Sequence, residues 1–427
     1  MTKEIKQHCS FCEIEASASV PMIAGAEGHI CEACVILASQ VVSSWGKKKA
    51  LSEIPKELPK PKEIKELLDQ YVIGQDLAKE ILAVAVYNHY KRLKHENSKV
   101  AGLGSADQSV EIGKSNILLI GSSGTGKTLL ASTLAKIVGV PFAVADATTL
   151  TQAGYVGDDV ENILVRLLDV ANGDISKAEW GIVYLDEVDK IARSPEQAIG
   201  TRDVSGEGVQ QALLRLVEGS LVKVSVKGRR KDQGGSGGDS VMIDTRNILF
   251  LAGGAFPGLE KYVEQRLVPG HTAIGFHAEM NAAEKPKLEE MLNATQPDDL
   301  KKFGLIPEFI GRFPVLAPLE PLDIDALIRV LTEPKNALVK QYQQLFSFDD
   351  VELEFTQDAL EEIAKQAIEH NTGARGLRGI MEKVLRRIMF DIPSRENVER
   401  CIVNAEVIKG EQDVEVIEHE ESEKVTQ

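Results

Sequence analysis

The sequence predicts an α/β protein with three parts: a small N-terminal module, a large domain built on a mostly parallel sheet, and a smaller, mostly helical α+β domain. Three observations support this prediction. A length of 427 residues suggests roughly three domains. Four of the five cysteines precede Val35. In the middle of the chain, the apolar run from Asn116 to Ile120 is followed by a glycine-rich loop and an apolar helix, which is typical of a buried parallel strand. Hydrophobic residues make up 43% and charged residues 27%, so disorder throughout is excluded.

The N-terminal cysteines have the spacing of a structural zinc site. The pattern is two C-x2-C pairs separated by eighteen residues, formed by Cys9, Cys12, Cys31 and Cys34. Two disulfides and a redox-active pair are the alternatives, and a chain without a secretory signal disfavours the first. Four thiolates leave no open position for catalysis. His8 and His29 are possible substitute ligands. The apolar residues around this site, such as Ile36 and Trp45, predict pairing with another copy or a partner.

Residues 1–48 therefore form the predicted zinc-binding domain. Residues 49–65 follow as a linker because Pro55, Pro59 and Pro61 lie among charged residues. The remaining cysteine, Cys401, is predicted to be a structural thiol.

The glycine-rich loop after Ile120 matches the complete phosphate-binding pattern G-x4-G-K-T. Its glycines let backbone amides surround phosphate oxygens, Lys127 reaches the β- and γ-phosphates, and Thr128 offers its hydroxyl to Mg²⁺. The following helix directs its positive N-terminus at the anion. The predicted ATP-binding residues here are Gly121, Ser122, Ser123, Gly124, Thr125, Gly126, Lys127, Thr128 and Leu129.

A second apolar strand, Gly181 to Leu185, ends in two acids. Asp186 is predicted to hold Mg²⁺, and Glu187 is placed to polarise an attacking water, which indicates hydrolysis rather than binding alone. Two solvated acids at a strand end are the alternative, which the upstream loop disfavours. Asp189 is predicted to be a supporting charge.

Two arginines are candidates for γ-phosphate contacts. Arg312 lies between Gly311 and Pro314, so a break in the chain presents it at a helix end. Such a guanidinium can stabilise the phosphate of a neighbouring subunit. Arg375 opens a helix, where a cation opposes the macrodipole and anion binding would explain it. Taken alone, either is more often a surface charge.

The chain resembles the ClpX family of AAA+ unfoldases, which work with the ClpP peptidase, and the resemblance extends from Cys9 to about Ile408. Besides the zinc pattern and the phosphate loop, it rests on these segments: Tyr71-Val72-Ile73-Gly74-Gln75, Gly154-Tyr155-Val156-Gly157, Arg202 to Gln211, Ile274-Gly275-Phe276, Ile306 to Arg312 and Gly373 to Arg378.

The resemblance implies roles for several residues. Val72 and Ile73 would contact adenine, Arg312 would be the arginine finger and Arg375 the sensor-2 arginine. Tyr155 and Val156 would form a pore loop that grips polypeptide, with Arg202 in a second one. Ile274, Gly275 and Phe276 would dock into clefts on ClpP.

The resemblance also implies an AAA+ P-loop NTPase architecture and an activity. Residues 66–318 would form the large ATPase domain and 319–410 the small one. Residues 411–427 lie outside the resemblance, and their acidic composition predicts a solvated tail. The chain would be an ATPase that unfolds tagged proteins through the pore of a homohexameric ring and delivers them to ClpP, and would also remodel proteins without ClpP. Its cofactors would be ATP, Mg²⁺ and Zn²⁺, and the zinc domain would bind substrates and adaptors and dimerise.

Two segments depart from the family pattern. The pore-entrance element is usually Arg-Lys-His, but here Asp232 stands where histidine is expected, after Arg229, Arg230 and Lys231. The strand from Asn247 to Leu251 ends in Ala252-Gly253-Gly254, which offers no polar sensor-1 residue.

Charge and hydropathy exclude other classes. Forty-nine Lys and Arg against 65 Asp and Glu give a net charge of −16, which disfavours a nucleic-acid motor. The chain has neither an apolar run of ~18 residues nor a signal peptide, so a cytoplasmic protein without membrane contact is expected. A metal-bearing scaffold and the related ATPase HslU are the remaining alternatives, disfavoured by the docking tripeptide, and for HslU also by the zinc pattern.

Overall fold

The structure is a computed structural model that describes residues 8–17, 20–25, 28–38, 58–100, 110, 112–151, 158–193, 206–226, 239–267, 287–395 and 397–418. The chain divides into two compact units, Met1–Glu57 and Leu58–Gln427. The first unit holds an antiparallel hairpin of β1 (Met22–Ala24) and β2 (His29–Cys31), and residues 32–38 are helical.

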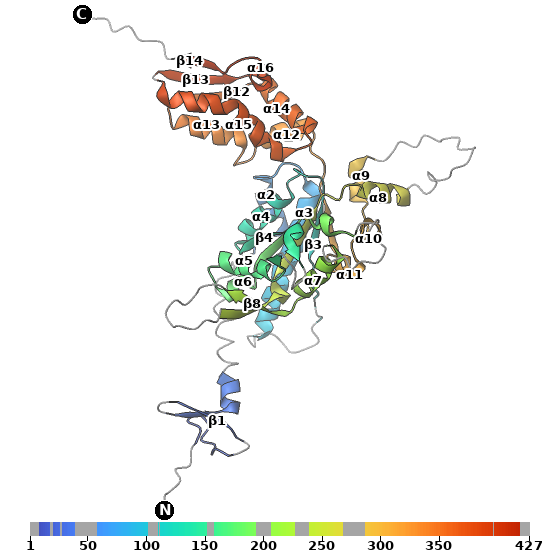
Figure 1. Ribbon diagram of the computed structural model, residues 1–427, viewed down its shortest axis with the longest axis vertical. Helices are drawn as coiled ribbons and strands as arrows, with labels where there is room; N and C mark the ends of the chain where they lie inside the picture. The colour runs from blue at the N-terminus through green and yellow to red at the C-terminus, as the bar shows by residue number, and fades with distance from the viewer. Residues whose placement is uncertain are drawn as a thin grey trace, which may run out of the picture. The chain divides into compact units, whose positions relative to one another are not determined.

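The second unit is built around a parallel sheet of five strands in the order β11-β3-β10-β7-β4. The strands are β3 (Ile117–Ile120), β4 (Phe142–Asp146), β7 (Ile182–Asp186), β10 (Leu249–Gly254) and β11 (Val315–Pro318). The three central strands are almost entirely buried, as expected for a parallel sheet covered on both faces. The predicted α/β large domain is thereby confirmed (Figure 1).

The other elements of this part of the chain surround the sheet or follow its strands. They are α2 (Pro61–Asp69), α3 (Asp76–Val100), α4 (Lys127–Val138), η1 (Ala147–Thr149), β5 (Leu150–Thr151), β6 (Asp158–Asp159), α5 (Asn162–Val170), α6 (Ile175–Ala178), η2 (Val188–Ile191), α7 (Glu207–Glu218), β8 (Leu221–Val226), β9 (Asp239–Asp244), η4 (Thr245–Asn247), α8 (Leu259–Leu267), α9 (Leu288–Asn293), α10 (Pro297–Phe303) and α11 (Pro307–Gly311).

A smaller α+β part follows, with its own apolar core. Its sheet has the order β12-β13-β14, formed by β12 (Glu352–Phe355), β13 (Val398–Val403) and β14 (Glu415–Glu418). The other elements are α12 (Ile324–Thr332), α13 (Leu338–Ser347), α14 (Gln357–Glu369), α15 (Ala374–Asp391), η5 (Ile392–Ser394) and α16 (Ala405–Lys409). Cys401 is fully buried in β13, where burial raises its pKa, so the prediction of a structural thiol is confirmed.

Two boundaries differ from the sequence-based ones. α2 begins at Pro61, inside the segment assigned to the linker, because proline suits the first turn of a helix. β14 lies inside the segment assigned to a solvated tail. It pairs antiparallel with β13, and Val414 and Val416 pack against the core of the small part. Acidic composition concealed the alternation of valines that makes this strand. Within the described residues, none of the helices has the length and apolarity that crossing a membrane requires.

Candidate nucleotide site and zinc centre

The four N-terminal cysteines converge on one point. Their Sγ atoms all lie within 4.8 Å of one another, and those of Cys12 and Cys31 are 3.6 Å apart. Zn–S bonds of about 2.3 Å at tetrahedral angles place sulfurs ~3.8 Å apart. The hairpin of β1 and β2 supplies Cys31, while Cys9 and Cys12 lie in the preceding turn. All four are free thiols, so the disulfide alternative is wrong.

The shifted pKa values of these thiols indicate electrostatic repulsion that a bound cation would remove. Burial by itself raises the pKa of Cys9, but hydrogen bonds from the backbone of Cys31, Phe11 and Cys12 outweigh it and lower this pKa to about 6. The neighbouring Cys12 sulfur, together with burial, raises the pKa of Cys34 to about 12. Four thiolates this close repel one another, and a divalent cation removes the repulsion. The donor set therefore fits Zn²⁺ with no open position.

The phosphate loop leads from β3 into α4 and is held open for an anion. Gly124 and Gly126 have φ of 82° and 99°, in the left-handed region that glycine adopts without strain. Among the described residues, the backbone N–H groups from Ser122 to Leu129 donate to no acceptor. Since buried or inward-facing amides normally have partners, such a row of free donors at a helix N-terminus is suited to phosphate oxygens.

Lys127 and Thr125 are turned inward onto the loop. The Lys127 Nζ donates to the Gly121 carbonyl at 2.6 Å and to the Ser122 carbonyl at 2.9 Å. Burial lowers the pKa of this ammonium, and the acids at the end of β7 oppose the effect. The Thr125 hydroxyl also donates to Ser122, at 2.9 Å. A phosphate placed over the loop would offer Lys127 stronger, charge-assisted partners than two neutral carbonyls.

The acids at the end of β7 meet the phosphate loop. Thr128 Oγ1 donates to Asp186 Oδ2 at 3.2 Å, so the two predicted Mg²⁺ ligands are adjacent. Glu187 is exposed and has φ 56° and ψ 34°, a left-handed conformation that is uncommon outside glycine. Its backbone N–H donates to Asp186 Oδ1 at 3.0 Å. This turn separates the two carboxylates, one partly buried beside Thr128 and one directed to solvent.

Two residues that the sequence did not single out in this way support the acids. The fully buried Tyr184 donates its hydroxyl to Asp186 Oδ1 at 3.2 Å. It precedes Asp186 by two positions on a strand, so the two share a face, and this alternation is the signal that could have found it. Asp189, predicted only as a supporting charge, is buried and accepts from the Ala255 N–H at 3.1 Å, just after β10. It therefore ties the β7 acids to the end of β10.

The segment between α2 and α3 carries Val72 and Ile73, which are both buried. Gln75, with φ 61°, exchanges two 2.8 Å hydrogen bonds with the backbone of Glu320, just after β11. Lys79 donates to the Val72 carbonyl at 2.6 Å. These polar contacts fix the short apolar segment to the sheet.

The small domain touches the phosphate loop through glycines. A Cβ at Gly124 would lie 2.6 Å from the Thr372 carbonyl and 3.1 Å from the Gly373 Cα. Arg375 is the second residue of α15, which begins directly after this contact, and its charge contributes to lowering the pKa of Lys127. The structure thus brings Arg375 into the neighbourhood of the phosphate loop.

Arg312 lies at the other end of the sheet. The phosphate loop follows the carboxyl end of β3, whereas Arg312 precedes the amino end of the parallel strand β11. Asn116, just before β3, donates to the Arg312 carbonyl at 2.8 Å. The half-exposed guanidinium is paired with Glu218, with Nη2 2.7 Å from Oε1. The length of a β-strand therefore separates Arg312 from the phosphate loop of its own chain.

Several predicted site residues lie outside the described residues. They are Tyr155, Val156, Arg202, Asp232 and the tripeptide Ile274-Gly275-Phe276.

Comparisons with known proteins agree with this architecture. Residues 113–316 match the family model "AAA domain (Cdc48 subfamily)", residues 322–406 match "C-terminal, D2-small domain, of ClpB protein", and residues 7–44 match "ClpX C4-type zinc finger". Together with the geometry above, these matches identify an ATPase whose cofactors are ATP, Mg²⁺ and Zn²⁺.

Two curated relatives align over nearly the whole chain. "ATP-dependent Clp protease ATP-binding subunit ClpX 3" of Methylococcus capsulatus is 65% identical over 415 residues, covering 97% of this chain and 95% of that protein. "ATP-dependent Clp protease ATP-binding subunit ClpX" of Azotobacter vinelandii is 55% identical over 405 residues, covering 95% and 90%. The chain therefore belongs to the ClpX family of AAA ATPases.

Proposed function

We propose that this ATPase is a protein unfoldase and translocase that works as a homohexameric ring, passes tagged substrates to the ClpP peptidase and also remodels proteins without it, in the cytoplasm. The observation that carries the ring is the position of Arg312. Because the length of a strand separates Arg312 from the phosphate loop of its own chain, it can contact a γ-phosphate only in a neighbouring subunit. The proposed domains are residues 1–48, 66–318 and 319–410.

The chemistry is divided among the residues around the phosphate loop. The free amides from Ser122 to Leu129 and the Lys127 ammonium would bind the phosphates. Thr128 and Asp186 would hold Mg²⁺, which would supply positive charge to neutralise the phosphates. Glu187, exposed beside Asp186, polarises the attacking water. Arg312 of the neighbouring subunit and Arg375 stabilise the charge that develops on the γ-phosphate, and Val72 and Ile73 contact the base.

The mechanical step uses the contact between the phosphate loop and α15. Hydrolysis changes the angle between the large and small domains, and Tyr155, Val156 and Arg202 move substrate along the pore. Ile274, Gly275 and Phe276 hold ClpP, and the zinc domain dimerises and receives substrates and adaptors. These assignments rest on the family resemblance of the segments.

The first experiment tests hydrolysis. Glu187→Gln keeps the shape of the side chain but removes the base, so ATP binding and ring assembly persist while turnover falls by at least 100-fold. Binding is measured by calorimetry, assembly by sedimentation and turnover by phosphate release. Normal turnover in this variant would show that Glu187 is misassigned.

The second experiment tests delivery, with a tagged folded protein, ATP, and ClpP present or absent. Deletion of Ile274 to Phe276 abolishes degradation but leaves unfolding intact, whereas Tyr155→Ala impairs both and spares hydrolysis. Degradation at the normal rate by the deletion variant would refute the docking role, and unchanged unfolding by Tyr155→Ala would refute the pore role.

A further inference from the structure

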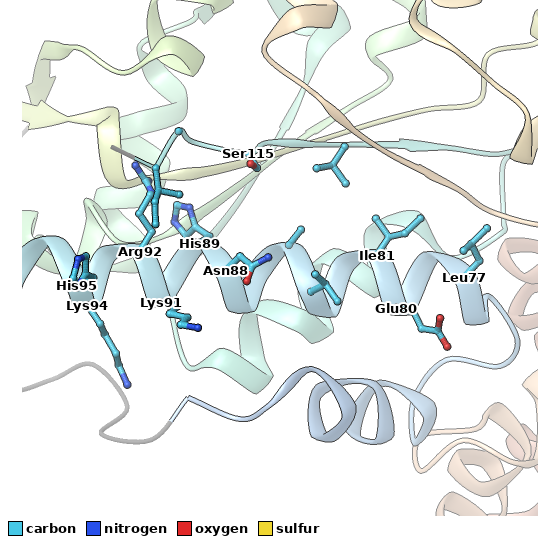
Figure 2. Close-up of a pocket in the computed structure, with 15 residues that line it drawn as sticks. Leu77, Glu80, Ile81, Asn88, His89, Lys91, Arg92, Lys94, His95 and Ser115 are labelled. Carbon is cyan, nitrogen blue, oxygen red and sulfur yellow. The ribbon is translucent and has the colours of Figure 1, made fainter. Parts of the chain in front are cut away.

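A cavity of about 1080 Å³ lies along α3, beside the segment that precedes β3 and the start of β11. One wall is the outward stripe of α3, and the other is the segment before β3 together with the first residue of β11. Figure 2 shows Leu77, Ile81, His89 and Arg92 projecting from the same side of this helix. The lining includes Ile112, Gly113, Ser115 and Val315. Ser115 and Val315 lie before or at the amino ends of their strands, so the Arg92 end of the cavity lies away from the phosphate loop. The Leu77 end follows Gln75, which is bonded to Glu320 at the carboxyl end of β11.

The two halves of the cavity differ in chemistry. The half near the start of α3 is lined by Glu80 and by apolar side chains, of which Leu77 and Val84 are 41% and 48% exposed. The half near its end is lined by cations, Lys91, Arg92 and Lys94. Along the helix, Ile81 and Arg92 are ~16 Å apart at 1.5 Å per residue. The cavity is thus suited to an elongated molecule with one apolar and one anionic end.

Arg92 presents an unused edge at the cationic end. Its side chain is only 10% exposed, and its Nη1 contacts Glu96 at a marginal 3.5 Å. Within the described part of the chain, its Nε and Nη2 are buried and have no hydrogen-bond partner. These two nitrogens form the side of the guanidinium that binds a pair of oxygens in a bidentate manner. An unsatisfied buried charge is costly, so these nitrogens need a partner that the described residues do not supply, such as a bound ion or water.

His89 adds a requirement that most anions do not meet. Its Nε2 must be the donor to the Asn247 carbonyl, 3.1 Å away, because a carbonyl oxygen only accepts. Burial, reinforced by Arg92 and Lys114, lowers the pKa of His89 to about 3, so the ring is neutral. Its Nδ1 is then an acceptor, and among the described residues this buried atom has no donor. The head group at this place should therefore carry a proton to donate.

Lys114 adds positive charge near Arg92 but supplies no hydrogen-bond partner to Arg92 or His89. Its Nζ donates to the carbonyls of Val217 and Thr245 at 3.2 and 3.1 Å and lies 4.6 Å from the centre of the Phe250 ring. Burial lowers its pKa to about 7, and Arg92 adds to the effect. An anion near Arg92 would stabilise the protonated form of this lysine as well.

We propose that this cavity binds a phosphate monoester with an apolar tail, through Arg92 and His89 at the head and through Ile81 and Leu77 along the tail. Two phosphate oxygens accept from Arg92 Nε and Nη2, and the P–OH of the monoanion donates to His89 Nδ1. Of the simple oxyanions, a sulfate monoester has the same shape and charge but no proton to donate, and a carboxylate presents its two oxygens only as acceptors. The apolar wall selects the tail by burial.

The test is calorimetric titration of the full chain, saturated with Mg²⁺ and ADP, with octyl phosphate below its micellar concentration. We expect one site per chain and weaker binding of octyl sulfate. Affinity should fall about fourfold for each methylene removed from the tail, the value for a buried CH₂ group. Binding that is seen only without ADP would place octyl phosphate at the nucleotide site and overturn the proposal, as would equal affinities for the sulfate and phosphate esters.

Two variants decide whether Arg92 is the head-group ligand. Arg92→Met keeps the length of the side chain and should weaken octyl phosphate binding about 10- to 100-fold, as expected for lost charged hydrogen bonds. Its melting temperature without ligand should be equal or higher, because an unsatisfied buried charge is removed, and this excludes misfolding. The matched control, Arg387→Met, alters an exposed arginine on α15 and should leave binding unchanged.

A third variant addresses His89. His89→Phe keeps an aromatic ring but removes the acceptor, so it should bring the affinities for octyl phosphate and octyl sulfate together. Unaltered binding in Arg92→Met, or an undiminished preference for phosphate in His89→Phe, would refute the site. Failure of octyl phosphate to bind the unaltered chain, checked by equilibrium dialysis as well as by calorimetry, would likewise refute the site.

Discussion

At the scale of single residues, the acids after β7 depend on a tyrosine inside the strand. Tyr184 reaches Asp186 Oδ1 while Thr128 reaches Oδ2, so both oxygens of the proposed Mg²⁺ ligand are oriented by hydrogen bonds. The adjacent strand leaves room for the ring only through Gly253, where a Cβ would overlap the Tyr184 hydroxyl. The glycines that end β10, which offer no sensor-1 side chain, thus have a steric purpose.

Tyr184→Phe should therefore weaken the response to Mg²⁺. Loss of one hydrogen bond to a carboxylate corresponds to about 1.5–3 kcal/mol, so we expect the Mg²⁺ concentration for half-maximal ATPase rate to rise at least several-fold. Tyr90→Phe is the matched control, because Tyr90 is equally buried but donates to the Trp180 carbonyl away from the site. If the two variants have the same Mg²⁺ dependence, Tyr184 does not position Asp186.

His89 makes the stability of the large domain depend on pH. Burial, with Arg92 and Lys114, depresses its pKa to about 3 in the folded state, against 6.5 in the unfolded chain. Below pH 6.5 the unfolded state binds the additional proton, so the contribution of His89 to stability is present at neutral pH and declines as the pH falls toward 3. Between pH 7 and pH 5 the decline amounts to about 2 kcal/mol.

His89→Gln should remove this part of the pH dependence, whereas His370→Gln, which alters an exposed histidine, should retain it. Urea unfolding followed by fluorescence at the two pH values measures the difference. Equal pH dependence in the wild type and His89→Gln would contradict the depressed pKa.

At the scale of elements, local sequence predicted best where one pattern dominates. The strand, glycine loop and helix from Asn116 to Val138 occur as predicted, because buried strands and phosphate loops have strict local requirements. The converging cysteines were equally predictable from their spacing. The start of α2 and the strand β14 were not, because prolines and acidic residues obscured the pattern. The contacts of Asp189 and Gln75 could not be predicted either, since their partners are distant in sequence.

β14 should therefore contribute to the stability of the small domain, although it lies in an acidic segment. A chain that ends at Gly410 exposes the edge of β13 and uncovers the apolar contacts of Val414 and Val416, so amides of Val398–Val403 should exchange at least tenfold faster with deuterium. A chain that ends at Glu418 keeps the strand and is the control. Unchanged exchange after the first truncation would mean that β14 adds no stability.

At the scale of the whole molecule, the two ends of the parallel sheet carry different candidate site residues. Its carboxyl ends carry the phosphate loop and the acids, while its amino ends carry Arg312 and lie beside the cavity along α3. Sequence analysis could name Arg312 as a finger candidate, but the direction of the strands is what supports the proposal that it acts on another subunit. The separation between Arg312 and the phosphate loop follows from the parallel order of the strands, which the sequence motif around Arg312 does not reveal.

Mixing two inactive variants should therefore restore activity. Arg312→Ala has an intact phosphate loop and Glu187→Gln has an intact finger, so a mixed ring contains complete sites at about a quarter of its interfaces if subunits assort randomly. ATPase assays on unfolded and co-refolded mixtures measure the rescue, with each variant alone as the control. No rescue at any mixing ratio would place the finger in its own chain.

The contact between Gly124 and Gly373 also offers a direct route by which movement of the phosphate loop could turn the small domain. At this contact, a methyl group on Gly124 would collide with the Thr372 carbonyl. α15 begins there and extends for 18 residues, which corresponds to ~27 Å at 1.5 Å per residue. In the proposed mechanism, a small displacement of the phosphate loop would therefore become a larger displacement at the far end of α15. Alanine at Gly124, whose Cβ would lie 2.6 Å from the Thr372 carbonyl, should therefore hold the small domain at one angle whichever nucleotide is bound.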